Sequence, residues 1–165
     1  MPLYKIHIYP NIALKTKAEE IQDLDNTVIK TLKNMTNTMY ASKGIGLAGP
    51  QVGILHRLVV IDTSFGKDIT HPMVLINPRI LEQEGSVKAE EGCLSFPDTY
   101  APVIRHERVL IEYVNKTGKE VRLEAHDFLA RVIQHEIDHL DGVCFIDRIS
   151  RIRRDLIKRK FFKKK

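Results

Sequence analysis

The sequence predicts an α+β domain in which short, mostly antiparallel sheets pack around one central helix. Apolar residues recur at helical spacing over about 125–141, which indicates a buried or half-buried helix. Short apolar runs separated by turn residues are typical of strands. A long helix near the N-terminus and a short basic helix at the C-terminus are expected to flank them, and such a mixture of elements favours an α+β arrangement.

Composition favours an ordinary globular protein. The 165 residues are enough for one domain with a substantial core, and the chain is 43% hydrophobic and 28% charged. We expect no membrane partner, because no run approaches the ~18 apolar residues of a membrane span. The two cysteines, Cys93 and Cys144, are far apart, so a disulfide framework is not expected and the cytoplasm is the expected compartment.

The first half of the chain contains three predicted segments. Residues 3–9 alternate loosely and could form a short edge strand. Apolar residues at steps of three and four over 17–39 predict a long amphipathic helix, with Thr16 as its N-cap and Glu19 completing a capping box. Residues 44–53 contain four glycines and a proline, so no regular element is expected there.

The second half supplies the predicted sheets and the remaining helices. Buried strands are expected at 58–61, 73–76 and 109–114. The turn sequence 115–118 leads into a further strand at 120–123. The helix over about 125–141 follows, ending before Gly142, and a basic helix over roughly 149–162 closes the chain.

The predicted central helix carries an H-E-x-x-H pattern, formed by His135, Glu136 and His139. Two histidines four residues apart project from one helix face and can bind one cation. Glu136 lies off the cation but close enough to move protons on a water bound to it. The alternative is a solvated helix that carries these residues by chance. The apolar surroundings argue against it, because buried polar groups need partners.

Cys93 is the best candidate for a third ligand. It follows Gly92, where the backbone can approach closely, and a thiolate gains strongly from coordinating a cation. A single cysteine is more often an inert buried side chain, but the two histidines already require another ligand, because a catalytic site keeps three protein ligands. Cys144 has no comparable setting, and we interpret it as a core residue.

Three segments of the chain resemble the motifs of the peptide deformylases, in that family's order and approximate spacing. They are Gly44–Gln51, Glu91–Ser95 and Gln134–His139. The resemblance covers essentially the whole chain. It implies a catalytic deformylase-like domain at 1–148, with 149–165 as a basic helix and tail of the same domain.

The resemblance also implies the reaction and the metal. A deformylase removes the N-formyl group from the N-terminal formyl-methionine of nascent polypeptides and releases formate. One divalent ion is expected, with Fe(II) favoured and Zn(II) or Ni(II) as possible substitutes, since a thiolate with two imidazoles suits these ions.

Roles for the other motif residues follow from this chemistry. Glu136 would act as general base and then as general acid. The Gln51 amide and the backbone N–H of Leu94 are candidates for stabilising the developing oxyanion. Ile45, Gly46 and Gly92 would pair with the substrate peptide as a strand is added to a sheet edge.

Two positions depart from the family pattern. Gly49 stands where alanine is usual, a small-for-small change that removes no functional group. Arg131 lies one helical turn before His135, where an apolar pocket residue is expected. We favour an arginine that extends to solvent over one that alters the rim of the substrate pocket.

Two other functions remain as alternatives. A general zinc-dependent peptidase of the H-E-x-x-H class commonly takes its third ligand downstream, but no histidine follows His139. A binding module with a structural metal would fill all four positions with Cys or His and would have no use for Glu136.

The basic tail suggests a polyanionic partner. Residues 151–165 hold nine Lys or Arg against Asp155 alone, a balance of +8, whereas the whole chain carries +5. We predict that this tail contacts the ribosome, with no DNA partner, although a solvated terminus that only aids solubility explains the charge equally well. The apolar residues Ile149, Ile152, Leu156 and Ile157 would dock the helix on the domain.

Overall fold

The computed structural model describes residues 2–64, 66–67 and 70–163. Over these residues the chain forms α-helices and antiparallel sheets, which confirms the predicted α+β class. The helices are α1 (Asn26–Ala41), α2 (Asp127–Leu140) and α3 (Arg151–Phe162), and single 3-10 turns are η1 (Ile12–Lys15), η2 (Gly49–Val52) and η3 (Phe145–Arg148). None of the described helices is long and apolar enough to cross a membrane.

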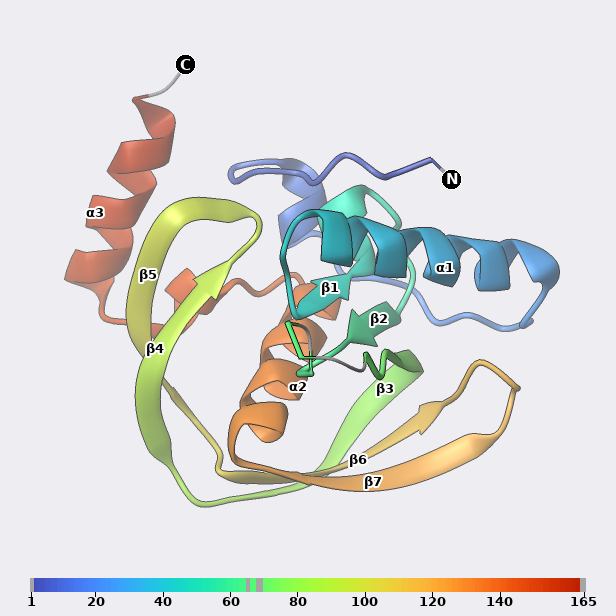
Figure 1. Ribbon diagram of the computed structural model, residues 1–165. Helices are drawn as coiled ribbons and strands as arrows, with labels where there is room; N and C mark the ends of the chain where they lie inside the picture. The colour runs from blue at the N-terminus through green and yellow to red at the C-terminus, as the bar shows by residue number, and fades with distance from the viewer. Residues whose placement is uncertain (1, 65, 68–69, 164–165) are drawn as a thin grey trace.

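Two antiparallel sheets surround α2 (Figure 1). The larger has the strand order β1-β2-β3-β6-β7 and the smaller is the β4–β5 hairpin. Their bounds are β1 Gly46–Ala48, β2 Leu58–Ile61, β3 Met73–Glu84, β4 Val87–Cys93, β5 Phe96–Arg105, β6 Arg108–Val114 and β7 Glu120–His126. The apolar face of α2 packs on the larger sheet, where Ile133 and Leu140 join Val59, Leu75 and Ile111 in one buried cluster. The hairpin covers the opposite side of the helix.

The predicted N-terminal helix is wrong in its first nine residues. The helix begins at Asn26, and the Asp25 side chain caps it by accepting a hydrogen bond from the Val28 N–H. The preceding segment hydrogen-bonds to other parts of the fold: Ala18 N donates to Leu140 O at 2.8 Å, and Glu19 N donates to Leu55 O at 2.9 Å. These tertiary bonds exclude the predicted capping box, because the backbone there is already paired.

Two other local predictions are wrong or incomplete. Residues 3–9 form no strand; instead Tyr9 N donates to Ser95 O at 3.0 Å, and the Tyr9 ring is buried. The glycine-rich segment 44–53, predicted to be irregular, contains the short strand β1 and the turn η2.

The structure explains why residue 49 in this segment is glycine. A Cβ at Gly49 would lie 2.5 Å from Ile54 O and 2.6 Å from His56 O. The missing side chain therefore allows the backbone of residues 54–56 to approach Gly49 closely.

The strand predictions are correct where the pattern is apolar. β2 matches its predicted bounds, β6 starts one residue earlier, and β3 and β7 extend further than predicted. The hairpin β4–β5 was not predicted, because it carries Lys88, Glu90, Glu91 and two prolines in place of an apolar run. The helices α2 and α3 lie within two residues of their predicted bounds.

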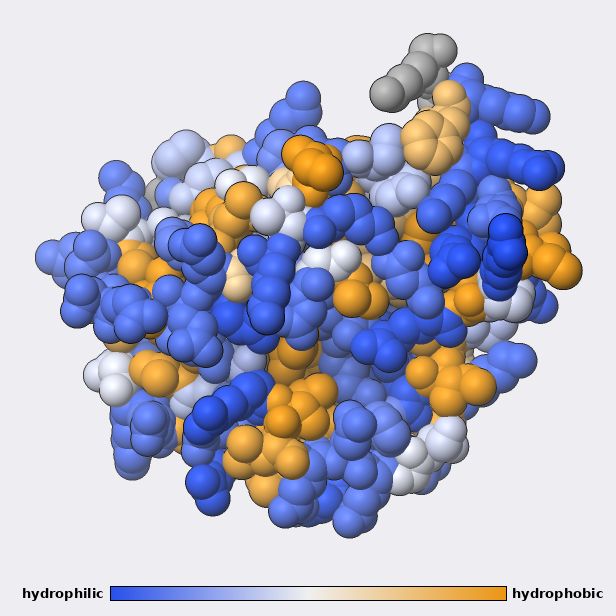
Figure 2. All heavy atoms as spheres, turned by 180° about the vertical axis from the view of Figure 1, so that it is seen from behind, coloured by the Kyte–Doolittle hydropathy of each residue, from blue (hydrophilic) through white to orange (hydrophobic). Residues whose placement is uncertain are grey.

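Of the four apolar residues predicted to dock α3 on the domain, two do so and two do not. Ile149 and Ile157 pack against the cluster around Phe145, but Ile152 and Leu156 are 76% and 58% exposed. Phe161, which was not predicted, is the buried anchor. Figure 2 shows mainly hydrophilic side chains over α3, at the upper right of that view. The last two residues of the predicted tail, 164–165, lie outside the described residues.

Candidate active site

Two elements bring the predicted metal ligands together. His135 and His139 project from one face of α2, and Cys93 ends β4. One ligand atom from each of these three residues lies within 4.8 Å of the others, and Cys93 Sγ is 3.3 Å from His139 Nε2. Among the described residues this is the one group of three or more potential ligands that converges in this way. A thiolate and two imidazoles form a donor set that suits a divalent transition metal.

Glu91 orients one of these histidines. Its Oε2 lies 2.9 Å from His135 Nδ1. Because a carboxylate only accepts, Nδ1 carries the proton and Nε2 is left for a cation. Burial alone would raise the pKa of Glu91, but hydrogen bonds from Arg105 and His135 hold that pKa well below its usual range. The carboxylate is therefore ionised and fixed.

Glu136 lies deep in the site without a fixed partner. Its side chain is buried, and its Oε2 has no hydrogen-bond partner among the described residues. Burial raises the pKa of Glu136 to about 7. Its carboxylate also packs against Gly46 in β1, where a Cβ would lie 2.8 Å from Glu136 Cδ. The residue is thus placed to exchange protons near neutral pH.

The side-chain amide of Gln51 has a defined orientation. Its Oε1 accepts a hydrogen bond from Ala48 N at 2.9 Å, so its NH₂ group faces the opposite way. Nε2 lies 3.2 Å from Ser95 Oγ and 3.5 Å from Cys93 Sγ. Leu94 follows Cys93 directly and also lines the cavity. The structure therefore places the Gln51 amide next to the cysteine.

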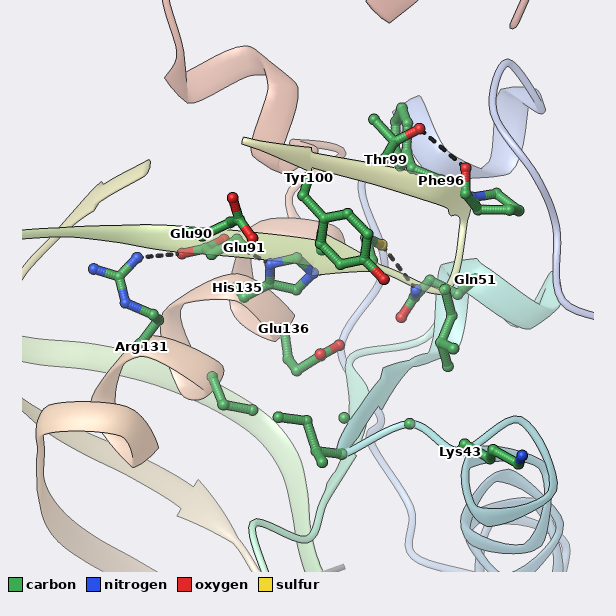
Figure 3. Close-up of a pocket in the computed structure, with 18 of the residues that line it drawn as sticks. Lys43, Gln51, Glu90, Glu91, Phe96, Thr99, Tyr100, Arg131, His135 and Glu136 are labelled. Atoms are coloured by element: carbon green, nitrogen blue, oxygen red, sulfur yellow. Dashed lines mark hydrogen bonds and ion pairs between the residues drawn. The ribbon is translucent and has the colours of Figure 1, made fainter. Parts of the chain in front are cut away.

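A cavity of about 660 Å³ opens onto these groups (Figure 3). Eight of the nine predicted site residues line it, namely Ile45, Gly46, Gln51, Gly92, Cys93, Leu94, His135 and Glu136. The ninth, His139, does not line the cavity and is 1% exposed. A space of this size accommodates a ligand larger than a single amino acid.

The sequence did not reveal Tyr100 and Phe128 as cavity residues. Both line the cavity, and both are more than half exposed. The Tyr100 ring lies against Gly92, where a Cβ would be 2.7 Å from Tyr100 Cε1. The contact with the Tyr100 ring therefore explains why residue 92 is glycine. The only hint of this in the sequence is that Tyr100, an aromatic residue, follows the cysteine motif by a few positions.

The preferred interpretation of Arg131 is wrong. The residue is 6% exposed and does not extend to solvent. Its guanidinium donates to Glu91 Oε1 at 2.7 Å, to Val103 O at 3.0 Å and to Val87 O at 2.8 Å. Arg131 lines the cavity, but its charge is directed to Glu91, as Figure 3 shows. By contrast, the interpretation of Cys144 as a core residue is confirmed, since it is 0% exposed and burial raises its pKa to about 12.

Comparisons with known proteins agree with this geometry. The family model described as polypeptide deformylase matches residues 3–155. A peptide deformylase of Thermodesulfovibrio yellowstonii is 47% identical over 165 residues, covering all of both chains. One of Halothermothrix orenii is 43% identical over 95% of this chain and its own full length.

Solved structures show the same similarity. The structure of a peptide deformylase from Legionella pneumophila has a TM-score of 0.92 and 36% identity, covering 98% of this chain and 95% of its own. That of peptide deformylase from Ehrlichia chaffeensis in complex with actinonin has a TM-score of 0.92 and 34% identity, covering 100% and 99%. The chain therefore belongs to the polypeptide deformylase family.

Proposed function

We propose that Cys93, His135 and His139 hold one divalent cation, beside which the reaction of the family takes place. As a member of that family the chain is a metal-dependent hydrolase that removes the N-formyl group from nascent peptides. The convergence of one cysteine sulfur and two imidazoles, of which Cys93 and His135 line the cavity, carries the proposal. A cation bound there supplies Lewis-acid chemistry and makes water a nucleophile near neutral pH.

We propose Fe(II) as the native ion, with Zn(II) or Ni(II) as substitutes. The mixed sulfur and nitrogen donor set supports this choice, because such a set accepts several borderline ions. Metal analysis after anaerobic purification, with activity measured per bound metal, tests it. A protein that contains only zinc after such a purification would contradict the preference for iron.

Glu136 is the proton carrier. Its buried carboxylate, with a pKa of about 7, can take a proton from the attacking water and give it to the leaving amine. Its free Oε2 supports this role, because no hydrogen bond from another described residue has to break first.

Gln51 and Leu94 stabilise the developing oxyanion. The Gln51 amide is held by Ala48 N and by Ser95 Oγ, so its donor is fixed before the reaction begins. The N–H of Leu94 belongs to the peptide bond that follows Cys93, so it has no side-chain freedom to lose. Donors that need no reorganisation stabilise a transition state most effectively.

The peptide binds in an extended form between two strand edges. β1 is the last strand of the larger sheet, and β4 pairs only with β5 among the described strands. Ile45, just before β1, Gly46, in β1, and Gly92, in β4, all line the cavity. Backbone groups at these edges can pair with a peptide as an added strand.

Hydrolysis of blocked peptides tests this function. The protein should release formate from formyl-Met-Ala-Ser and leave acetyl-Met-Ala-Ser and unblocked Met-Ala-Ser intact, as expected of a hydrolase that removes the formyl group. Cleavage of the unblocked peptide would instead favour the general zinc peptidase.

We also propose that α3 contacts the ribosome, in the cytoplasm, and that residues 149–165 belong to the same domain as 1–148. The exposed residues of α3 and its C-cap include Ile152 and Leu156 together with the cations Arg153, Arg159 and Lys163. Binding through phosphates should weaken steeply with salt, because counterions are released.

Charge reversal is a better test of α3 than deletion. Phe161 is 7% exposed, and its ring centroid lies 5.4 Å from that of Phe96, so removing the helix would uncover the core. A variant with Arg153, Arg159 and Lys163 changed to Glu should lose ribosome co-sedimentation at low salt and keep its turnover of formyl-Met-Ala-Ser. The control reverses Lys116 and Lys119 in the exposed β6–β7 turn. Equal co-sedimentation of both variants would contradict the proposal.

A further inference from the structure

A layer of ionised side chains is buried between α2 and the β4–β5 hairpin. Arg105 Nε donates to Glu91 Oε1 at 2.8 Å, and its Nη2 donates to Oε2 at 3.0 Å. Arg105 Nη1 also donates to Asp138 Oδ2 at 2.5 Å. Glu91, Arg105 and Asp138 are all at most 7% exposed. Buried charges persist only when they are paired in this way, and removing one partner is strongly destabilising.

Arg131 also donates a hydrogen bond to the Glu91 carboxylate. Its Nη1 donates to Glu91 Oε1 at 2.7 Å, while His135 Nδ1 donates to Glu91 Oε2 at 2.9 Å. Arg131 and His135 are four residues apart on α2, so their side chains lie on one helix face. Two neighbouring side chains of the helix therefore hold the two oxygens of one glutamate, as Figure 3 shows.

The hydrogen bonds from Arg131 and His135 to Glu91 connect α2 and β4, the two elements that carry the proposed metal ligands. Glu91 and Cys93 are both on β4, two residues apart, and both meet α2, Glu91 Oε2 at His135 Nδ1 and Cys93 Sγ at His139 Nε2. Holding Glu91 against α2 thus also holds Cys93 relative to His135. Arg131 reinforces this register from the same position, because its guanidinium donates to Val87 O in β4 and to Val103 O in β5.

We propose that Arg131 is a positioning residue of the metal site, which acts through Glu91 to keep Cys93 on β4 in register with His135 on α2. The proposal rests on the proposed function in one respect, since it takes Cys93, His135 and His139 as the ligands. Arg131 itself touches neither the cation nor the reacting atoms.

Cobalt(II) binding by the full-length apoprotein tests the proposal. The readouts are the dissociation constant from competition with a chelator and the thiolate-to-cobalt absorption band. Arg131→Met should weaken cobalt affinity by about 10-fold or more and shift the band, because outer-shell changes typically have effects of 10–100-fold. Arg131→Lys keeps a charge near Glu91, so its cobalt affinity should lie between that of Arg131→Met and that of wild type.

A double-mutant cycle asks whether Arg131 acts through Glu91. The variant with both Arg131→Met and Glu91→Gln should lose less cobalt affinity than the sum of the two single losses, since coupled residues are not additive. The matched control is Arg122→Met, an arginine that also pairs with a glutamate, Glu112, but whose side chain is 70% exposed. It should bind cobalt like wild type. Thermal unfolding of each apoprotein separates lost stability from lost affinity.

Three results would overturn the proposal. They are wild-type affinity in Arg131→Met, equal loss in Arg131→Met and Arg131→Lys, and additive losses in the double variant. A wild-type protein that shows no thiolate band with cobalt would instead mean that the proposed ligand set is wrong, so the two failures are distinguishable.

Discussion

A methyl group added at Gly46 should displace the proton carrier. The Cβ of Gly46→Ala would contact Glu136 Oε1 and lie 2.8 Å from Glu136 Cδ, whereas ordinary contacts begin at 3.4 Å. The Cδ atom would have to withdraw by about 0.6 Å, and the oxygen by more. Since a misplacement of about 1 Å can lower a rate by about 100-fold, we expect kcat to fall by about 10- to 100-fold, or ~1.4–2.7 kcal/mol in the barrier.

Gly49→Ala is the matched control in the same loop. Its Cβ would meet two backbone carbonyl oxygens, of Ile54 and His56, at 2.5 and 2.6 Å. Backbone cannot swing aside as a side chain can, so we expect a loss of stability of about 1–3 kcal/mol. The kcat of the folded fraction should stay close to wild type.

The assay compares formate release from formyl-Met-Ala-Ser per bound metal with the thermal midpoint of each variant. Gly46→Ala should lose kcat with its metal content retained and a small change in midpoint, and Gly49→Ala should show the reverse. Wild-type kcat in Gly46→Ala, or a parallel loss of metal, would refute the placement of Glu136 against β1.

Three further predictions concern the ligand, its oxidation and acid stability. Cys93→Ser should lose metal on dialysis against a chelator, because the soft ligand is gone; full occupancy would exclude Cys93 as a ligand. Air should inactivate the iron form by oxidising Cys93 and not the buried Cys144, while the zinc form survives; mass spectrometry that places the oxidation elsewhere, or equal decay of both forms, would count against this. Burial alone would raise the pKa of Asp62, but hydrogen bonds from Ser64 and Tyr40 lower it. Asp62 therefore stabilises the fold above its unfolded pKa of about 4, and that stability is lost as pH falls through the lower folded pKa. The difference in thermal midpoint between wild type and Asp62→Asn should be full at pH 6–7 and shrink below pH ~4, and a constant difference would contradict this.

The site was largely predictable from sequence because its residues lie in short motifs. His135, Glu136 and His139 share one helix, whose periodic apolar pattern identified it. Cys93 followed from the need for a third ligand. The structure brings Cys93, His135 and His139 together.

Arg131 could not be predicted in the same way. Its partner Glu91 is 40 residues away, in a hairpin whose charged sequence does not resemble a buried strand. A lone arginine in an apolar helix is more often one that reaches solvent. Only the tertiary structure shows that a buried carboxylate meets it.

The fold predictions failed where long-range contacts override local pattern. The spacing over 17–39 is helical, but backbone groups of Ala18 and Glu19 pair with Leu140 and Leu55, so the helix starts at Asn26. On α3, the most exposed of the predicted docking residues is Ile152, and the buried anchor is Phe161. Which apolar residues a short helix buries depends on the neighbouring surface, and the sequence of the helix does not contain it.

Replacing Glu136 tests the central claim most directly, namely that this chain hydrolyses the formyl group at a Cys93–His135–His139 metal site with Glu136 as proton carrier. Glu136→Ala should bind one metal ion per chain as wild type does and release no measurable formate from formyl-Met-Ala-Ser. A variant that loses metal and activity in parallel, or one that retains metal and still releases formate at the wild-type rate, would contradict the claim.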